Sequence, residues 1–300
     1  MSRTANAENL PGPDQVYPLG ALRTALAACG DYVYAYYGKR EYPEAPFYVG
    51  RGRGLRVLTH WKNAVSDKPA AVLKQQEVEI RTILQRGQLP TVKLLAYNVE
   101  QTLSTGVYSL VERVIQDAFG IQKVWQKRPG LADRVVSMPT STLVQVREDS
   151  AGAPVLAFDT LIGMKGQRDT VGLAELGELA GAPLLLVGLM RTFHPSYSSG
   201  QLAEMARMYW NLDRFRDCRT APLKAARDAA LLAWRTLDGR PTIVGAWRIR
   251  RGSYDNSHAA GRYSFKLQRP DMALRRAVIG LALEGDGRNY MGPQIVLPDR

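Results

Sequence analysis

The stretch DYVYAYYGKREYPEAPFYVGRGRGLRVLTH, residues 31–60, decides the fold of the N-terminal part of this 300-residue chain. Two of its segments, 31–37 and 45–50, are rich in aromatic and β-branched residues, which indicates two short strands. The connection GKREYPE has the glycine, proline and charge content of a hairpin loop, so we expect the strands to pair as an antiparallel hairpin. Arginines, alternating glycines and a histidine follow the second strand, so a cationic segment leaves the hairpin.

Helices and a third strand surround this hairpin in the sequence. Apolar residues at helical spacing predict helices over 18–29 and 70–86, each followed by a glycine, and residues 90–99 have the composition of a strand. A further helix is expected over 105–119. The apolar side of the helix at 70–86 is expected to contain Val72, Val78, Ile80, Ile83 and Leu84. These elements predict an α+β fold with a small, mainly antiparallel, three-stranded sheet flanked by helices.

The composition changes between residues 128 and 154, where prolines, glycines and a serine/threonine cluster are concentrated. Such a composition indicates a connection with one hairpin, in which residues 142–148 pair with residues 155–160. The predicted division is a flexible N-terminus, a first domain and a second domain, at residues 1–17, 18–128 and 129–300.

The second domain is expected to be α+β as well, and a small β-barrel is one form that it could take. An Asp-Gly pair at 238–239 marks a hairpin turn between two strands rich in aliphatic and aromatic residues. Helices are predicted at 173–180 and 199–211. Strands are predicted at 183–190, 230–236, 242–250 and 262–267.

The chain is basic, with 40 Lys and Arg against 28 Asp and Glu, a formal net charge of +12 and a pI near 9.8. This balance favours a polyanionic partner. Between residues 235 and 276 there are ten basic residues and three acidic ones, with aromatic residues among them. Basic strands with aromatic side chains can follow a phosphate backbone and stack on bases. Alternatively, Trp234, Trp247 and Phe265 fill a core while the arginines alternate outward.

The cysteine content and the hydropathy indicate the compartment. Cys29 and Cys218 are too few for a disulfide framework or a cysteine-based zinc site, which favours a reducing, cytoplasmic location. No apolar run approaches the roughly 20 residues of a membrane helix, and the N-terminus lacks the apolar segment of a signal peptide. We therefore expect a soluble protein without a membrane partner, and nothing in the sequence indicates an oligomeric state.

An ordered set of residues resembles the GIY-YIG nuclease superfamily. In order, the set is YVY at 32–34, YVG at 48–50, Arg56, His60 and Glu112. The form PFYVGRGRGLRVLTH, residues 46–60, is most similar to the branch that includes the LEM-domain and ankyrin-repeat nucleases and many bacterial relatives. The resemblance covers residues 31–116, and it implies an enzyme that hydrolyses phosphodiester bonds.

The resemblance implies a role for each of these residues. Tyr48 would act as the general base or hold the attacking water, with Tyr34 beside it. A free tyrosine has a pKa near 10, so such a base needs positive charge nearby. Arg56 would bind the scissile phosphate by a two-pronged contact. His60 follows four residues later, on the same face of a helix that begins near Gly54, and would contact Tyr34 or a phosphate oxygen.

A metal ion is implied as well. Glu112 would be the single metal-binding carboxylate and would hold Mg²⁺ (or Mn²⁺) together with several waters, so that the ion stabilises the leaving oxygen. Glu77 and Glu79 are other glutamates on a nearby helix. Further contacts with the nucleic acid are expected from Arg51, Arg53 and Lys62.

The second domain resembles, less specifically, a domain that follows GIY-YIG domains in bacterial proteins of this branch. The shared arrangement is a helix that ends in a tryptophan, a strand pair and a further aromatic-bearing strand, and it implies substrate recognition. The candidate nucleic-acid-binding residues are Trp210, Trp247, Arg248, Arg250, Arg251 and Tyr263.

The resulting prediction is a metal-dependent endonuclease that acts on DNA, with a second domain that selects the substrate, in a setting such as bacterial defence. A nuclease that acts on RNA is one alternative. Another alternative is a catalytically impaired nucleic-acid-binding module. It rests on a departure from the family, because residues 116–134, which follow Glu112, lack the asparagine that members often carry.

Overall fold

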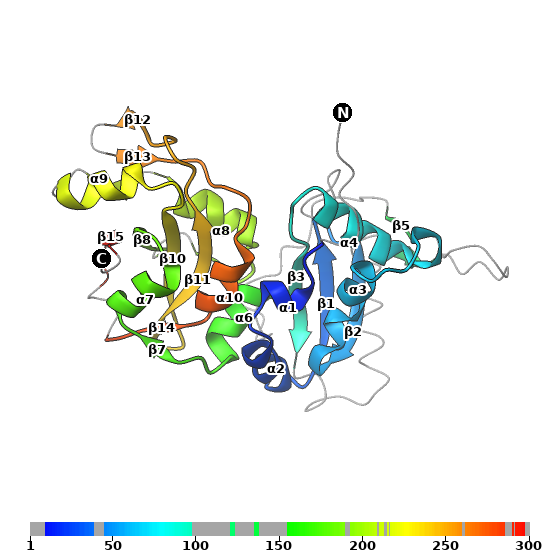
Figure 1. The fold of residues 1–300 in the computed structure, drawn as a ribbon. Helices are drawn as coiled ribbons and strands as arrows, with labels where there is room; N and C mark the ends of the chain where they lie inside the picture. The colour runs from blue at the N-terminus through cyan, green and yellow to red at the C-terminus, as the bar shows by residue number, and fades with distance from the viewer. Residues whose placement is uncertain are drawn as a thin grey trace, which may run out of the picture. The chain divides into compact units, whose positions relative to one another are not determined.

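The computed structural model describes residues 10–38, 45–97, 121–123, 135–137, 155–189, 193–208, 210–212, 215, 217–259, 262–285, 290 and 292–297. Contacts within the chain form two compact units, unit 1 (Met1–Asp14 and Leu26–Phe158) and unit 2 (Gln15–Ala25 and Asp159–Arg300) (Figure 1). Both contain helices and strands, so the chain is an α+β protein. The predicted boundary after residue 128 and the expected helix at 105–119 lie outside the described residues.

Unit 1 is built on an antiparallel sheet with the strand order β2-β1-β3-β6. Its strands are β1 (Asp31–Tyr37), β2 (Tyr48–Arg53), β3 (Thr91–Tyr97) and β6 (Leu156–Ala157). The antiparallel pairing of the first two strands and the third strand are confirmed. The fourth strand, β6, extends the three-stranded sheet that we expected. A separate antiparallel pair consists of β4 (Ile121–Lys123) and β5 (Val135–Ser137).

Two helices precede this sheet in the chain, α1 (Pro13–Val16) and α2 (Leu19–Ala27). Helix α2 confirms the helix predicted at 18–29. Gly30 has a φ of 59°, the left-handed conformation that commonly ends a helix and that glycine adopts without strain.

Helices α3 (Thr59–Ala64) and α4 (Gln75–Gln85) cover one face of the β1–β2 hairpin (Figure 1). The helix predicted at 70–86 is confirmed in its second part, while its first part is the short 3₁₀ helix η3 (Ala70–Val72). Ile80, Ile83 and Leu84 are buried as expected, but Val72 is 65% exposed. Val72 is exposed because it lies before α4 and therefore does not belong to the row of apolar residues that repeats along that helix.

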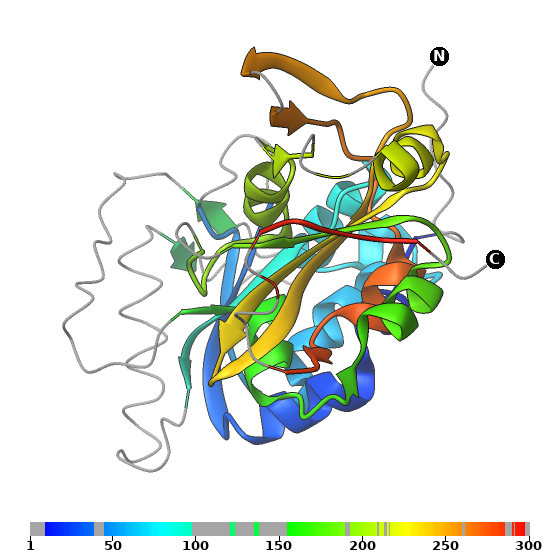
Figure 2. The same ribbon diagram turned by 90° about the vertical axis from the view of Figure 1, so that its left-hand side faces the viewer.

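Unit 2 contains a curled sheet with the strand order β15-β8-β10-β11-β14-β7. The long hairpin of β10 (Ala230–Leu237) and β11 (Arg240–Arg248) lies at its centre and twists along its length (Figure 2). Asp238 and Gly239 have φ of 47° and 79°, the positive angles that a two-residue hairpin turn requires, which confirms the predicted turn. The other strands are β7 (Thr170–Val171), β8 (Leu184–Gly188), β14 (Ala282–Leu283) and β15 (Gln294–Val296). Among the described strands β15 and β7 are the two edges, so this sheet is open rather than a closed barrel.

Five helices and a small second sheet complete this half of the chain as far as it is described. The helices are α6 (Phe158–Lys165), α7 (Leu173–Ala180), α8 (Ser199–Ala206), α9 (Asp217–Ala225) and α10 (Met272–Val278). The second sheet has the order β12-β13-β9, with β9 (Trp210–Asn211), β12 (Asp255–Ala259) and β13 (Arg262–Ser264). None of the described helices is long and apolar enough to cross a bilayer.

Two predictions of secondary structure after residue 154 are wrong. The strand expected at 155–160 ends at Ala157, where α6 begins, and its short β6 part pairs with β3. The helix expected at 199–211 ends at Ala206, because the chain turns there into β9. Both errors come from pairing between segments that are distant in the sequence.

The interior of unit 2 contains large aromatic side chains and the buried ion pair of Arg275 and Asp159. Trp234, Trp247 and Phe265 are all buried, which confirms the alternative in which these aromatics fill a core. Arg275 donates through Nη2 to both carboxylate oxygens of Asp159, each at 2.7 Å, and both residues are buried. A charge removed from water in this way is tolerated because its partner is also buried and hydrogen-bonded.

Candidate active site

The face of the β1–β2 hairpin beneath α3 carries a row of tyrosines. Because side chains alternate along a strand, Tyr32, Tyr34 and Tyr36 share one face of β1, and the register places Tyr48 of β2 opposite Tyr36. Neighbouring ring centroids in this row are 5.9 to 6.4 Å apart, within the range of favourable aromatic contacts. Tyr34 and Tyr48, predicted to lie beside each other, are neighbours in this row.

The glycines of β2 make room for this row. A Cβ atom at Gly50 would lie 2.6 Å from the hydroxyl oxygen of Tyr48, and one at Gly52 would lie 2.9 Å from the ring of Tyr32. Both distances are shorter than van der Waals contact, so a larger residue would displace a ring. The alternating glycines therefore allow Tyr48 to lie back over its own strand.

Two of the tyrosines hold the segment that follows β2, the 3₁₀ helix η2 (Gly54–Leu58). The hydroxyl of Tyr36 donates to the carbonyl oxygen of Val57 at 2.6 Å, and the hydroxyl of Tyr32 donates to the carbonyl oxygen of Gly54. The amide of Val57 in turn donates to the Tyr32 hydroxyl at 3.3 Å. These bonds fix the start of α3, and with it the position of His60, against the sheet.

A continuous chain of hydrogen bonds runs from Tyr48 through His60 to Glu77. The hydroxyl of Tyr48 lies 3.1 Å from Nε2 of His60, and Nδ1 of His60 lies 3.2 Å from Oε1 of Glu77. Asn63 of α3 donates to the same Oε1 at 2.8 Å, and the amide of Lys74 donates to Oε2 at 3.0 Å. Both oxygens of Glu77 are therefore engaged, and the three residues, called here the Tyr48–His60–Glu77 chain, hold each other in place.

The electrostatics determine the direction of these hydrogen bonds. Although burial opposes it, the hydrogen bonds from Asn63, Lys74 and His60 lower the pKa of the Glu77 carboxyl, so this group is ionised at neutral pH. Burial lowers the pKa of His60, so its ring is neutral at pH 7, even though Glu77 acts in the opposite direction. An ionised carboxylate can only accept, so Nδ1 of His60 carries the proton, and Nε2 accepts the hydrogen bond from Tyr48.

Tyr34 has a different environment from Tyr48. Burial, followed by the proximity of Tyr48, raises the pKa of Tyr34 well above its ordinary value. Tyr34 is therefore a neutral phenol that hydrogen-bonds to Tyr48, while Tyr48 itself is only half-buried and can be reached from solvent. His60, which we expected at Tyr34 or a phosphate oxygen, contacts the hydroxyl of Tyr48, and its contact with a phosphate stays a prediction.

The cationic residues of this region are divided between two faces. Arg56 is exposed in η2, and its charge is among those that oppose protonation of His60, so it lies near the chain. It shares a continuous helical segment with His60, although that segment begins as a 3₁₀ helix. Lys62 is exposed on α3. Arg51 and Arg53 alternate with the glycines of β2 and so lie on the face opposite Tyr48.

The metal-binding residue of the prediction, Glu112, lies outside the described residues. Within the described ranges, no group of three or more His, Cys, Asp or Glu residues gathers to hold a metal ion. Glu77 is a poor substitute, because both of its oxygens already accept hydrogen bonds from the protein.

The candidate residues of the second half differ in how accessible they are. Trp247 is 3% exposed, and the guanidinium of Arg248 donates to Asp271 at 2.8 Å and to two backbone carbonyls. Tyr263 is half-buried with Nζ of Lys224 over its ring, while Arg250 and Arg251 are exposed. Trp210 is half-buried and donates through Nε1 to the carbonyl oxygen of Ala206.

The partner of His60 was not predicted. From the sequence, Glu77 is only another glutamate on a helix near the site, and Asn63 has no distinguishing feature. One signal was present: Glu77 shares a face of α4 with the apolar residues Ile80 and Leu84, a position at which a carboxylate is unusual. Arg81 on the same face ties α4 to the end of α3, since its guanidinium donates to the carbonyl oxygens of three residues there, Ala64, Ser66 and Lys68.

Comparison of the chain with protein-family models, curated proteins and solved structures found no match.

Proposed function

We propose that the chain is a GIY-YIG-type endonuclease that hydrolyses phosphodiester bonds in DNA, acts in the cytoplasm and uses unit 2 to bind its substrate. The observation that supports this most is the Tyr48–His60–Glu77 chain. It places the hydroxyl of the half-buried Tyr48 on a neutral imidazole that is backed by a buried carboxylate. This is the arrangement that activates a hydroxyl or a water at neutral pH.

The proton path follows from these hydrogen bonds. As a water oxygen attacks phosphorus, the water gives its proton to the Tyr48 oxygen, and Tyr48 passes its own proton to Nε2 of His60. The resulting imidazolium is stabilised by the ionised Glu77, which already accepts from Nδ1. The bond from phosphorus to the leaving oxygen breaks, and that oxygen is protonated from solvent. Tyr48 therefore takes the proton from water and relays it to His60, which accepts it and later releases it to solvent, and Glu77 is a positioning residue.

The charge on the phosphate is met by Arg56 and by a metal ion. Arg56 is exposed beside the chain, so its guanidinium can bind two non-bridging oxygens at once. Glu112 would hold Mg²⁺ (or Mn²⁺), and when bound the ion would stabilise negative charge on the leaving oxygen. Arg51 and Arg53, on the other face, would contact the nucleic acid away from the scissile bond, and Lys62 would contact it beside α3.

The test is cleavage of plasmid DNA, modified phage DNA and structured RNA in the presence of Mg²⁺ or Mn²⁺. The wild type is compared with Arg56→Ala, Glu112→Ala and the control Tyr37→Phe. Tyr37 is a buried β1 tyrosine that packs with Val33 and Ala35 on the other face of the strand. We expect cutting by the wild type and the control, and none by the other two variants.

Two outcomes would change the proposal. If the chain cuts only RNA, then RNA rather than DNA is the substrate, and the proposed active site is unchanged. Salt-sensitive binding with no cutting of any substrate would favour the binding module, for which the absence of an asparagine after Glu112 is the available support.

A further inference from the structure

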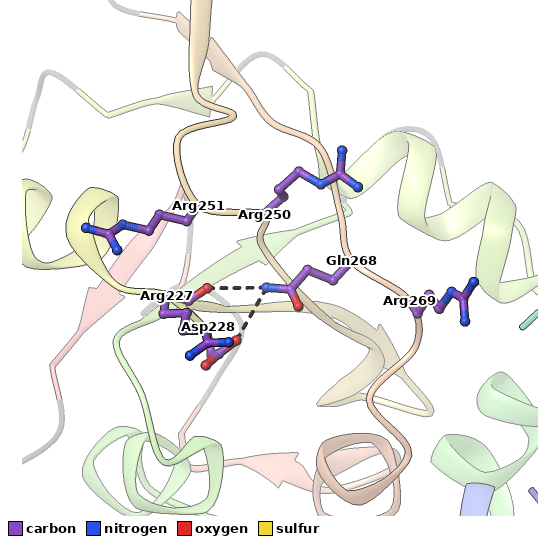
Figure 3. A pocket seen from close by; sticks show the side chains of 6 residues that line it. All are labelled: Arg227, Asp228, Arg250, Arg251, Gln268 and Arg269. Atoms are coloured by element: carbon purple, nitrogen blue, oxygen red, sulfur yellow. Dashed lines mark hydrogen bonds between the residues drawn. The ribbon is translucent and has the colours of Figure 1, made fainter. Parts of the chain in front are cut away.

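A depression on unit 2 is lined by arginines from three separate segments. Its volume is about 520 Å³, and its lining residues are Arg227, Asp228, Arg250, Arg251, Gln268 and Arg269 (Figure 3). Residues 227–228 connect α9 to β10, residues 250–251 follow β11, and residues 268–269 precede α10. The site therefore combines loops at one end of the central hairpin.

Gln268 joins the three segments. Its side-chain Nε2 donates to the carbonyl oxygen of Ile249 at 3.1 Å and to that of Arg227 at 3.3 Å, and it lies 3.5 Å from Oδ1 of Asp228. The backbone adds a bond from the amide of Arg250 to the carbonyl oxygen of Lys266 at 2.8 Å. The loops are thus held by groups other than the guanidinium groups, so the arginines are not needed to hold the depression together.

The four arginines have exposed side chains. Among the described residues, none of their guanidinium groups forms an ion pair or a side-chain hydrogen bond, and Asp228 is the only acid that lines the depression. Other arginines of unit 2 are engaged internally, such as Arg248 with Asp271 and Arg275 with Asp159. Four unpaired cations around one hollow produce a positive potential that attracts anions.

The arrangement of the arginines indicates the size of the anion. Figure 3 shows that the guanidinium groups of Arg250, Arg251 and Arg269 point in different directions rather than toward one point. A single phosphate could meet only part of this set, whereas a strand with a phosphate at every nucleotide can meet several of them. None of the lining residues is aromatic, so the depression offers no surface on which a base could stack.

We propose that this depression binds the phosphodiester backbone of a nucleic-acid strand through Arg227, Arg250, Arg251 and Arg269. The inference rests on the proposed function for the identity of the polyanion, and it makes this part of unit 2 a sequence-independent binding surface. The contacts position the substrate and do not select among bases.

The test is fluorescence anisotropy with a labelled duplex oligonucleotide, across a series of salt concentrations and without divalent metal, so that no cleavage occurs. The variants are the full chain with Arg250→Glu/Arg251→Glu and with Arg227→Glu/Arg269→Glu. The control is Arg23→Glu/Arg276→Glu, which makes the same change in net charge at exposed arginines that do not line the depression. Arg→Gln versions of each pair replace any Glu variant whose circular dichroism shows misfolding.

We expect the slope of log affinity against log salt to become shallower by about 2 in each double variant, because each phosphate contact on duplex DNA contributes roughly 0.9. The loss should be equal for oligonucleotides of different sequence, and the control should keep most of the wild-type slope. Slopes in the two double variants equal to that of the control would overturn the proposal. So would displacement of DNA by millimolar phosphate beyond the effect of chloride at equal ionic strength, since it would indicate a site for a single anion.

A failure of this proposal and a failure of the proposed nuclease are distinguishable. If the wild type cuts no substrate, the double variants can still show the shallower slope of log affinity against log salt, which would support the binding surface without the nuclease. A chain that cuts DNA but shows no change in slope keeps its active site and places the DNA-binding surface elsewhere.

Discussion

The candidate active site of unit 1 and the arginine depression of unit 2 differ in what their charged groups contact. In unit 1, both oxygens of Glu77 and both ring nitrogens of His60 are within hydrogen-bonding distance of protein partners, and Glu77 is 3% exposed. In unit 2, four exposed guanidinium groups have no such partner among the described residues. Proton transfer requires groups that are already oriented before substrate arrives, whereas attraction of a polyanion requires charges that are still unpaired.

The largest expected effect comes from a change at Tyr48, the first residue of the Tyr48–His60–Glu77 chain. Tyr48→Phe removes the hydroxyl that His60 contacts and leaves the ring in place. We expect cleavage to fall by roughly 10²- to 10⁴-fold, the usual contribution of a positioned acid–base group, while duplex binding stays within about twofold of wild type. Single-turnover cleavage and anisotropy measure the two quantities. Loss of binding together with cleavage would indicate that Tyr48 binds substrate rather than activating water.

The second prediction concerns a charge that is buried and paired within unit 2, in contrast to the exposed arginines. Asp159→Ala leaves Arg275 buried without its carboxylate, and we expect the free energy of unfolding to fall by about 3–5 kcal/mol. The control is Glu204→Ala, which breaks the exposed pair of Glu204 and Arg207 and should cost about 0–1 kcal/mol. Urea denaturation followed by circular dichroism compares them. Equal losses in the two variants would show that the buried pair contributes no more than a surface pair.

The third prediction removes the charge of Glu77 and keeps its shape. In Glu77→Gln the imidazolium formed during proton transfer loses its anionic partner, so we expect cleavage to fall by roughly 10²-fold. Because Glu77 raises the pKa of His60, its neutralisation should also move the acid limb of the pH–rate profile to lower pH. The half-buried Glu79 of the same helix provides the control, Glu79→Gln. A rate loss without a shift of the acid limb would mean that Glu77 only supports the fold.

These comparisons also show which features the sequence could predict. The strands at 31–37 and after residue 45 were predicted because alternation, turn residues and aromatic content are local signals. The steric role of Gly50 and Gly52, which make room for the tyrosine rings, was not predicted because it depends on how those rings lie over β2. The contact of His60 with Glu77 depends on how α4 packs against α3, and no local pattern encodes that packing. The same holds for the arginine depression, whose residues come from three segments separated by more than 15 residues each.

The smallest expected effect is a pH dependence of the free energy of unfolding, and it originates in the Tyr48–His60–Glu77 chain. Burial lowers the pKa of His60 below its ordinary value of 6.5, so the unfolded chain takes up a proton near that pH before the folded chain does. As the pH falls below about 6.5, the unfolded state is therefore favoured, and the free energy of unfolding should decline by at most about 1.4 kcal/mol per pH unit. Glu77 acts in the same direction, but only below its own ordinary value of 4.5.

His60→Gln removes the titrating group and isolates this effect. Thermal or urea unfolding is measured between pH 7.5 and 5.5. As the pH falls, the free energy of unfolding should decline more steeply for the wild type than for His60→Gln. At the alkaline end of the range, the two slopes against pH should be equal. Parallel curves would mean that His60 binds its proton equally well in both states, so that burial between Tyr48 and Glu77 does not lower its pKa. The exposed arginines of unit 2 stay charged throughout this range, so Arg250→Gln/Arg251→Gln should run parallel to the wild type and separate the two kinds of charge.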